Sequence, residues 1–201
     1  MCLIPNGVET PPAGVDAPCD TPPTFVFVGR LHAIKRLDLL IDAFARVAAV
    51  SPEARLVIAG PDEQGLRASL EARHPLGARV TWLGAVDAAR RDAVLAQARA
   101  LVLCSDSESF GMAVVEAMAA GRAVIVTRTC GWNDLERRGA GLLVDQTPAA
   151  IADAMQRLLD VRAAAEMGVK GRRWVEEAFT WDAVAGRFIE TYSTLGQAVP
   201  T

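Results

Sequence analysis

Apolar residues recur along this chain in two alternating patterns, one with the spacing of a strand and one with that of a helix. Thr24–Val28 is a short aromatic and β-branched run that ends at Gly29, which is typical of a buried β-strand. From Leu37 to Ala48 apolar residues then recur every three or four positions, with charged residues such as Asp38 between them. This second spacing predicts an amphipathic helix that packs one face against a sheet.

The same cycle of strand and helix repeats along the chain. Further strands are predicted at Arg55–Ala59, Val80–Trp82, Ala100–Cys104, Ala123–Val126 and Gly141–Val144. Further helices are predicted at Glu63–Ala72, Ala88–Ala98, Gly111–Ala119, Pro148–Leu159, Ala163–Ala178 and Trp181–Leu195. Such alternation indicates parallel strands joined by right-handed crossovers, and continuously apolar strands indicate a sheet covered on both faces. The sequence therefore predicts an α/β fold with a doubly wound, Rossmann-like parallel sheet.

Residues 1–23 show neither pattern. They hold six of the eleven prolines and no periodic apolar positions, so a regular element is not expected there. We interpret residues 1–23 as an interdomain connector and residues 24–201 as one domain. A chain that opens in a connector is expected to be a fragment of a longer protein, or Met1 is not its natural start.

Composition and charge narrow the classes of function. A net charge of −3 over 201 residues provides no general attraction for nucleic acid. The four cysteines, at positions 2, 19, 104 and 130, form no C-x-x-C pair and have no zinc-ligand spacing with the two histidines, so reduced thiols and no metal site are expected. No apolar run approaches the roughly 18 residues of a membrane-spanning helix, and no signal peptide is evident. These features predict a cytoplasmic protein, with peripheral membrane contact left open.

The residues after the first predicted strand form a candidate anion site. Parallel sheets bind ligands outside the carboxyl ends of their strands, and Gly29 lies there together with Arg30 and Lys35. A planar guanidinium and a mobile ammonium beside a helix N-terminus suit a diphosphate. The alternative is that both cations are solvated residues beside Asp38 and Asp42.

A second candidate is Glu116, the one charged residue in the apolar run from Gly111 to Gly121. A helix that is apolar all round is normally buried, and a buried carboxylate needs partners. The two hydroxyls of a ribose could supply them. The alternative is a structural ion pair, for which Arg30 or Lys35 is the expected cation.

Glu108 precedes the same helix. Its carboxylate could contact a ligand together with the free N–H groups of Phe110, Gly111 and Met112 at the helix start. Alternatively, its charge only favours the helix N-terminus.

At these residues the chain resembles the large family-4 class of retaining glycosyltransferases, which have the two-domain GT-B fold. Glu108 and Glu116, with seven residues between them, resemble the E-x7-E motif of that family, and GRLHAIKR resembles its Gly-Arg-Leu-x-x-x-Lys motif. IPNGVE near the start resembles the end of its interdomain crossover. The resemblance covers essentially the whole chain, which corresponds to about half of such an enzyme.

The resemblance implies a role for each candidate residue. Arg30 and Lys35 would hold the diphosphate of a UDP-, GDP- or ADP-linked sugar, Glu108 the transferred sugar, and Glu116 the ribose. Backbone amides near Phe110–Met112 would face phosphate or sugar, at the same edge as Gly29, and the base would lie against the loop after Gly84. No metal or other cofactor would be needed, because cations and helix dipoles neutralise the leaving group. The acceptor would bind to an N-terminal domain that is missing from this chain.

Three departures from the family pattern limit this transfer of roles. Arg36 and Ser109 stand where glycines are common. CGWND at 130–134 stands where the family more usually has a Gly-rich loop that contains a glutamate, which leaves Trp132, Asn133 and Asp134 only weak candidates for sugar contact. Two other functions stay open: a non-catalytic module that binds a nucleotide sugar, and a nucleotide-sugar epimerase of the same fold.

Overall fold

The computed structural model describes residues 4–10 and 22–197. Its centre is a sheet of six parallel strands in the order β3-β2-β1-β4-β5-β6. The strands are β1 (Thr24–Val28), β2 (Arg55–Ala59), β3 (Val80–Gly84), β4 (Ala100–Leu103), β5 (Ala123–Thr127) and β6 (Gly141–Val144). This is the strand order of a Rossmann-like doubly wound sheet, so the predicted fold is confirmed.

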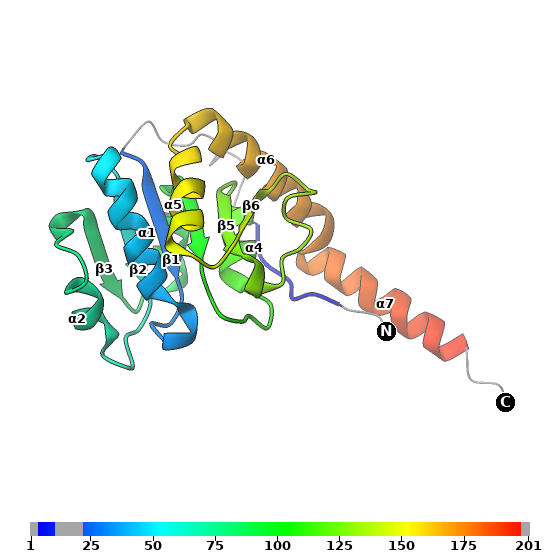
Figure 1. Cartoon of the computed structure of the whole chain (residues 1–201). Coiled ribbons are helices and arrows are strands. Elements are labelled where there is room, and N and C mark those ends of the chain that lie inside the picture. Colours follow the sequence, from blue (N-terminus) through cyan, green and yellow to red (C-terminus); the bar gives the residue numbers. More distant parts are fainter. Residues whose placement is uncertain (1–3, 11–21, 198–201) are drawn as a thin grey trace.

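Helices cover both faces of the sheet (Figure 1). They are α1 (Leu37–Val50), α2 (Leu66–Glu71), α3 (Ala88–Ala96), α4 (Met112–Ala119), α5 (Pro148–Arg157), α6 (Val161–Ala178) and α7 (Trp181–Gln197). On one face α1 packs against α5, and on the other α4 packs against α6. Helix α7 extends away from the body of the domain. No helix in the described ranges is long and apolar enough to cross a bilayer.

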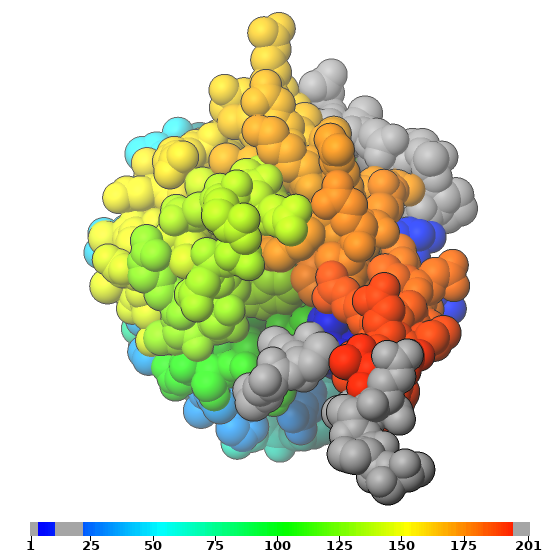
Figure 2. All heavy atoms as spheres, turned by 90° about the vertical axis from the view of Figure 1, so that its right-hand side faces the viewer, coloured from blue at the N-terminus to red at the C-terminus, as the bar shows by residue number. Residues whose placement is uncertain are grey.

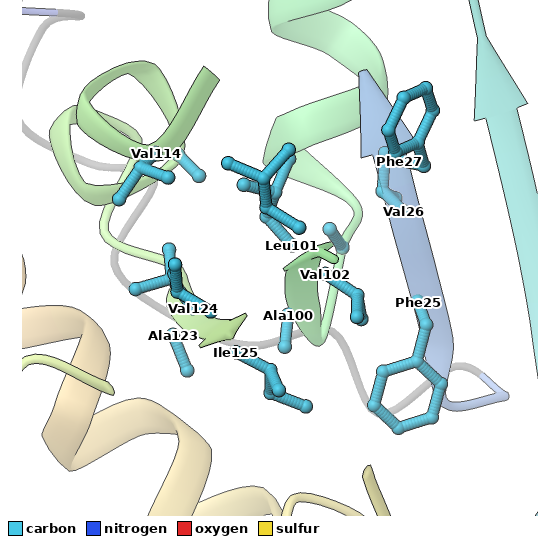
Figure 3. Close-up of a cluster of buried hydrophobic side chains, with 14 of the residues drawn as sticks. Phe25, Val26, Phe27, Ala100, Leu101, Val102, Val114, Ala123, Val124 and Ile125 are labelled. Atoms are coloured by element: carbon cyan, nitrogen blue, oxygen red, sulfur yellow. The ribbon is translucent and has the colours of Figure 1, made fainter. Parts of the chain in front are cut away.

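The core lies around the three central strands. Phe25, Val26 and Phe27 of β1 pack with Leu101 of β4 and Ile125 of β5, and all five are at most 1% exposed (Figure 3). Both faces of these strands are covered, which explains why their sequences are apolar without alternation.

Three helices begin at residues other than those predicted, and the smallest difference is in α4, which starts at Met112 and not at Gly111. Helix α2 starts at Leu66 and not at Glu63, because the carboxylate of Asp62 accepts hydrogen bonds from the N–H groups of Leu66 and Arg67, at 2.8 and 3.0 Å. Helix α6 starts at Val161, two residues early, because Asp160 caps it. For α2 and α6 alike, an aspartate side chain that accepts hydrogen bonds from N–H groups of the first turn stabilises the helix start.

The described part of the predicted connector, residues 4–10, lies against the junction of α6 and α7. Val8 forms a parallel bridge with Thr180, and its N–H donates to the carbonyl oxygen of Phe179 at 2.8 Å. In Figure 2 these N-terminal residues, in blue, lie beside the orange and red of α6 and α7. The prediction that no regular element forms here agrees with residues 4–10, which hold only this isolated bridge.

Gly168 is expected to be essential for the packing of α6. A Cβ atom there would overlap the carbonyl oxygen of Gly121, which cannot move freely because it belongs to the backbone between α4 and β5. Gly168→Ala should therefore lower the free energy of unfolding by about 1–3 kcal/mol. Gly186 of α7 is the matched control, since nothing lies within 4 Å of its Cβ position. Gly186→Ala should leave stability unchanged or raise it slightly. Equal chemical denaturation midpoints for the two variants would contradict this prediction.

Candidate active site

The strand order places two loops at the centre of the carboxyl edge of the sheet. Strands β1 and β4 are neighbours, but the chain runs outward from β1 to β2 and β3, and outward on the other side from β4 to β5 and β6. The loops that follow β1 and β4 therefore diverge onto opposite faces, which opens the crevice where doubly wound sheets bind ligands. Residues 29–36 and 104–111 form these loops.

An ion pair joins the two loops. Lys35 ends the short 3-10 helix Ala33–Lys35, and its Nζ lies 2.6 Å from Oε1 of Glu108. The hydroxyl of Ser105 donates to the same carboxylate oxygen at 2.6 Å. The two charged side chains are only 19% and 10% exposed, so salt screens this pair less than a surface pair. The sequence predicted both residues as ligand contacts but did not predict their pairing.

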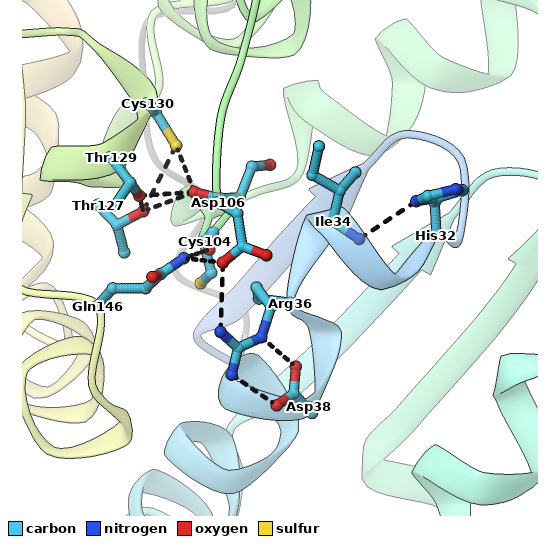
Figure 4. Close-up of polar contacts among 11 residues, drawn as sticks. His32, Ile34, Arg36, Asp38, Cys104, Asp106, Thr127, Thr129, Cys130 and Gln146 are labelled. Atoms are coloured by element: carbon cyan, nitrogen blue, oxygen red, sulfur yellow. Dashed lines mark hydrogen bonds and ion pairs between the residues drawn. The ribbon is translucent and has the colours of Figure 1, made fainter.

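Asp106 reinforces the connection between the loops (Figure 4). Its N–H donates to the carbonyl oxygen of Ile34 at 2.8 Å, and its carboxylate accepts from the guanidinium of Arg36 at 3.2 Å. The side-chain amide of Gln146 donates to the same carboxylate at 3.0 Å. Backbone and side-chain contacts therefore set the position of Lys35 relative to Glu108.

The backbone conformation of Arg36 explains why glycine is common at this position in the family pattern that the chain resembles. Arg36 has φ 50° and ψ 44°, and among the described residues it is the one non-glycine with positive φ. This conformation costs a side chain roughly 1–2 kcal/mol. Two hydrogen bonds from the Arg36 guanidinium to Asp38, at 3.1 and 3.0 Å, offset that cost. Burial alone would raise the pKa of Asp38, but its bonds and charge interaction with Arg36 lower that pKa below its usual value.

Arg30 is the cation that remains available at this edge. Backbone hydrogen bonds of its two neighbours hold it in place. The N–H of Gly29 donates to the carbonyl oxygen of Ala59 at 2.9 Å, and the N–H of Leu31 donates to that of Pro61 at 2.8 Å. Its side chain is exposed and makes no ion pair within the described part of the chain. A guanidinium that is held at its base and unpaired at its tip suits an incoming anion.

The turn at 110–112 leads into α4. Gly111 has φ 82° and ψ 57°, which favours glycine, and it precedes the helix that the sequence predicted to begin at 111. It provides no side-chain cap, so the first N–H groups of α4 keep their capacity to bind a ligand.

Trp132 supports this turn. It is buried, and its Nε1 donates to the carbonyl oxygen of Phe110 at 3.0 Å. Its ring lies 5.6 to 5.9 Å from the rings of Phe110, Trp174 and Phe179. The structure speaks against Trp132 as a candidate for sugar contact, because the residue is buried, its Nε1 is bonded to the Phe110 carbonyl oxygen and its ring packs against three other aromatic rings.

Glu116 pairs with Arg91 of α3, and not with Arg30 or Lys35 as the alternative interpretation expected. One Arg91 nitrogen lies 2.8 Å from Oε1 of Glu116, whose side chain is 15% exposed. Burial raises the pKa of Glu116 above its usual value, and the charge of Arg91 offsets this only in part. A carboxyl group whose pKa is raised on folding makes the folded state less stable when it is ionised than when it is protonated. The negative charge of Glu116 therefore does not stabilise the fold.

The structure brings some of the predicted site residues together and separates others. Lys35 and Glu108 touch, while Glu116 lies one turn beyond Met112 on α4. Gly84 ends β3, which is separated from β1 by β2. The sequence missed the contacts of Ser105, Asp106, Gln146 and Arg91. The polar run after β4 signalled the first two, but nothing in the α3 sequence indicated that Arg91 reaches α4.

Cysteines and carboxylates do not gather into a metal site within residues 4–10 and 22–197: no group there contains three potential ligands. Cys104 and Cys130 are buried free thiols, and burial raises the pKa of both. Cys2 and Cys19 lie outside the described residues.

Comparison with known proteins identifies the family of this chain. The family model described as "Glycosyl transferases group 1" matches residues 22–161, well over half of the chain. The chain belongs to the group 1 glycosyl transferases. The matched range contains both loops, the Lys35–Glu108 pair and Glu116.

Individual relatives agree with this assignment. A GDP-mannose-dependent alpha-(1-6)-phosphatidylinositol dimannoside mannosyltransferase of Mycobacterium tuberculosis is 32% identical over 85% of this chain and 44% of its own length. Sucrose-phosphate synthase of Thermosynechococcus elongatus superposes with a TM-score of 0.83 and 31% identity, over 98% of this chain and 53% of that one. The Anabaena HepE protein, solved with UDP-glucose, shares the fold with a TM-score of 0.76 and 21% identity, over 87% and 49% of the two chains. The chain thus spans about half the length of these relatives.

Glu116→Gln in this glycosyl transferase domain should leave the fold intact. Arg91 keeps Asp92 as a second partner at 2.9 Å and is partly exposed, so the change leaves no unpaired buried cation. We expect a melting temperature within about 2 °C of the unchanged chain. Val115→Ala, in the same helix and fully buried, should cost about 2 kcal/mol and serves as the control for a structural defect. A thermal loss for Glu116→Gln as large as that of the control would show that the ion pair is structural.

Proposed function

We propose that this chain is the donor-binding half of a retaining, metal-independent GT-B glycosyltransferase, and that the crevice between the β1 and β4 loops receives a nucleotide sugar. The observation that carries the proposal is the juxtaposition of Lys35 and Glu108, 2.6 Å apart, where strand order reverses in a group 1 glycosyl transferase. In this proposal the cation pairs with the diphosphate and the carboxylate accepts hydrogen bonds from the hydroxyl groups of the sugar.

The diphosphate would bind to Arg30 and Lys35. Arg30 offers a planar fork that is unpaired within the described residues, and Lys35 offers a point charge already held beside the start of α4. As the bond between sugar and phosphate breaks, negative charge grows on the leaving diphosphate. Cations and helix N–H groups arranged in advance stabilise that charge without reorganising, which is why no metal ion is needed in the proposed reaction.

The two carboxylates would recognise the hydroxyl groups of the donor. Glu108 has its second oxygen available for the transferred sugar, because the described contacts with Lys35 and Ser105 both use Oε1. Glu116 would accept hydrogen bonds from the ribose diol. Its raised pKa supports this role, because ionisable groups with a shifted pKa cluster at functional sites and the ionised Glu116 does not stabilise the fold.

The donor is one of a few nucleotide sugars. The mannosyltransferase relative is GDP-mannose-dependent by name, and HepE was solved with UDP-glucose. We therefore propose UDP- and GDP-linked hexoses as the first donors to test on this chain, with ADP-linked sugars third.

The rest of the enzyme would contact α7. Trp181, Phe188, Ile189 and Tyr192 lie at helical spacing on α7 and are 43% to 67% exposed. Exposed apolar side chains in such a group mark a contact surface. Because the chain spans about half the length of its relatives, we propose that the N-terminal acceptor domain covers this stripe.

Loss of either cation should weaken donor binding. Arg30→Ala and Lys35→Ala should each lower the affinity for UDP or GDP by about 1.5–3 kcal/mol, the value of a hydrogen bond between charged groups. Arg46→Ala, an exposed cation on α1 away from the crevice, is the charge-matched control and should bind normally. Titration calorimetry measures all three. Unchanged affinity in both site variants would contradict the proposal that Arg30 and Lys35 bind the diphosphate.

The chain alone should bind its donor but not transfer the sugar. Transfer requires donor and acceptor to be oriented together, an advantage worth roughly 7–11 kcal/mol of barrier. An open half-site also leaves the diphosphate in contact with water, which weakens its electrostatic contacts. Slow hydrolysis of the donor can remain, because water needs no binding site. The test incubates the chain with labelled UDP-glucose or GDP-mannose and a panel of acceptors. Efficient, saturable transfer would overturn the proposal that an acceptor domain is required.

A further inference from the structure

Arg91 lies beside the proposed nucleoside site and borders the same hollow as Glu116. It projects from α3 into a hollow of about 560 Å³ that also borders Met112 and Glu116 of α4, the segment 7–10, and Trp181 of α7. The hollow begins where the free N–H groups of α4 lie and extends along that helix. It is therefore the space next to Glu116 in which a nucleoside could be accommodated.

The contact between Arg91 and Glu116 uses only part of the carboxylate. Arg91 donates to Oε1 at 2.8 Å, while Oε2 accepts no hydrogen bond from the described residues. A carboxylate has about four acceptor positions on its two oxygens, so one guanidinium nitrogen and two ribose hydroxyls can be bound at once. The ion pair and the ligand do not compete for the same sites.

Resting on the proposed function, we infer that Arg91 is a positioning residue for the donor, which holds Glu116 by one oxygen and leaves the other for the ribose diol. Arg91 itself is held by Asp92, 2.9 Å away on the same helix. Its guanidinium thus has a fixed place between a surface carboxylate and the ligand-binding one. Arg91 acts on the nucleoside through Glu116 and need not touch it.

Electrostatics gives Arg91 a second effect on the same carboxylate. The charged groups around Glu116 are Arg91 and Asp92 from α3 and Glu9 from the segment 7–10. Burial raises the pKa of Glu116, Arg91 lowers it, and Asp92 raises it. Removal of Arg91 therefore raises the pKa further. The carboxylate then becomes protonated at a higher pH, where it loses acceptor capacity for the diol.

A double-mutant cycle tests whether Arg91 acts through Glu116. The affinity of the full chain for UDP and for GDP is measured by calorimetry for Arg91→Ala, Glu116→Gln and the double variant. Arg91→Ala should weaken binding about tenfold, because Glu116 is then no longer held in place for its charged hydrogen bonds to the ribose diol. In the Glu116→Gln background the same change should have no further effect, because the residue it positions is no longer a carboxylate.

Two matched variants separate this role from general charge. Arg90→Ala removes a neighbouring exposed cation from α3 and should bind as the unchanged chain does. Arg91→Lys should recover part of the lost affinity. Relative to Arg90→Ala, the deficit of Arg91→Ala should grow as the pH is lowered, because Glu116 becomes protonated at a higher pH without Arg91. This comparison cancels the titration of the nucleotide phosphate. Thermal melts confirm that each variant is folded.

The outcomes distinguish this inference from the proposed function. If UDP, GDP and ADP all fail to bind the unchanged chain, the proposed function fails first. If they bind but Arg91→Ala behaves as Arg90→Ala does, Arg91 has no positioning role. An equal loss in both backgrounds would mean that Arg91 contacts the ligand directly, and tighter binding by Arg91→Ala would mean that it blocks the site. Either result would overturn the inference.

Discussion

The pairing of β1 with β4 is the contact on which the rest of this molecule depends. These two strands are distant in sequence, yet they lie together at the centre of the sheet and are buried on both faces. Because the chain leaves them in opposite directions, their following loops diverge and leave a crevice. Lys35 and Glu108 can meet there because each follows one of these two strands.

Local costs at this edge are offset by neighbouring contacts. Arg36 adopts a backbone conformation that glycine would adopt more easily, and its bonds to Asp38 and Asp106 stabilise it there. Glu116 is a partly buried carboxylate that does not add to stability when ionised, and Arg91 limits its cost. Strained backbone and shifted pKa values cluster at functional sites, where the position of a group matters more than its contribution to the stability of the fold.

The aromatic group around Trp132 links the site to the far end of the chain. Trp132 bonds the backbone at Phe110, and its ring packs on Phe179, just before α7. Residues 4–10 pair with the same junction through Val8. The turn that leads into α4 is thus supported by the junction of α6 and α7 and, through it, by the N-terminal segment.

Sequence alone determined the fold, because strands buried on both faces and amphipathic helices have apolar periods that are visible along the chain from Thr24 onward. It also singled out Arg30, Lys35, Glu108 and Glu116 as candidate ligand contacts, since charges beside glycines or within an apolar helix stand out. Only the tertiary structure decided which charges meet. Lys35 with Glu108 and Glu116 with Arg91 are pairs distant in sequence, and strand order and helix packing bring them together. No local period encodes a contact between residues on different elements, so those partners could not be read from the chain.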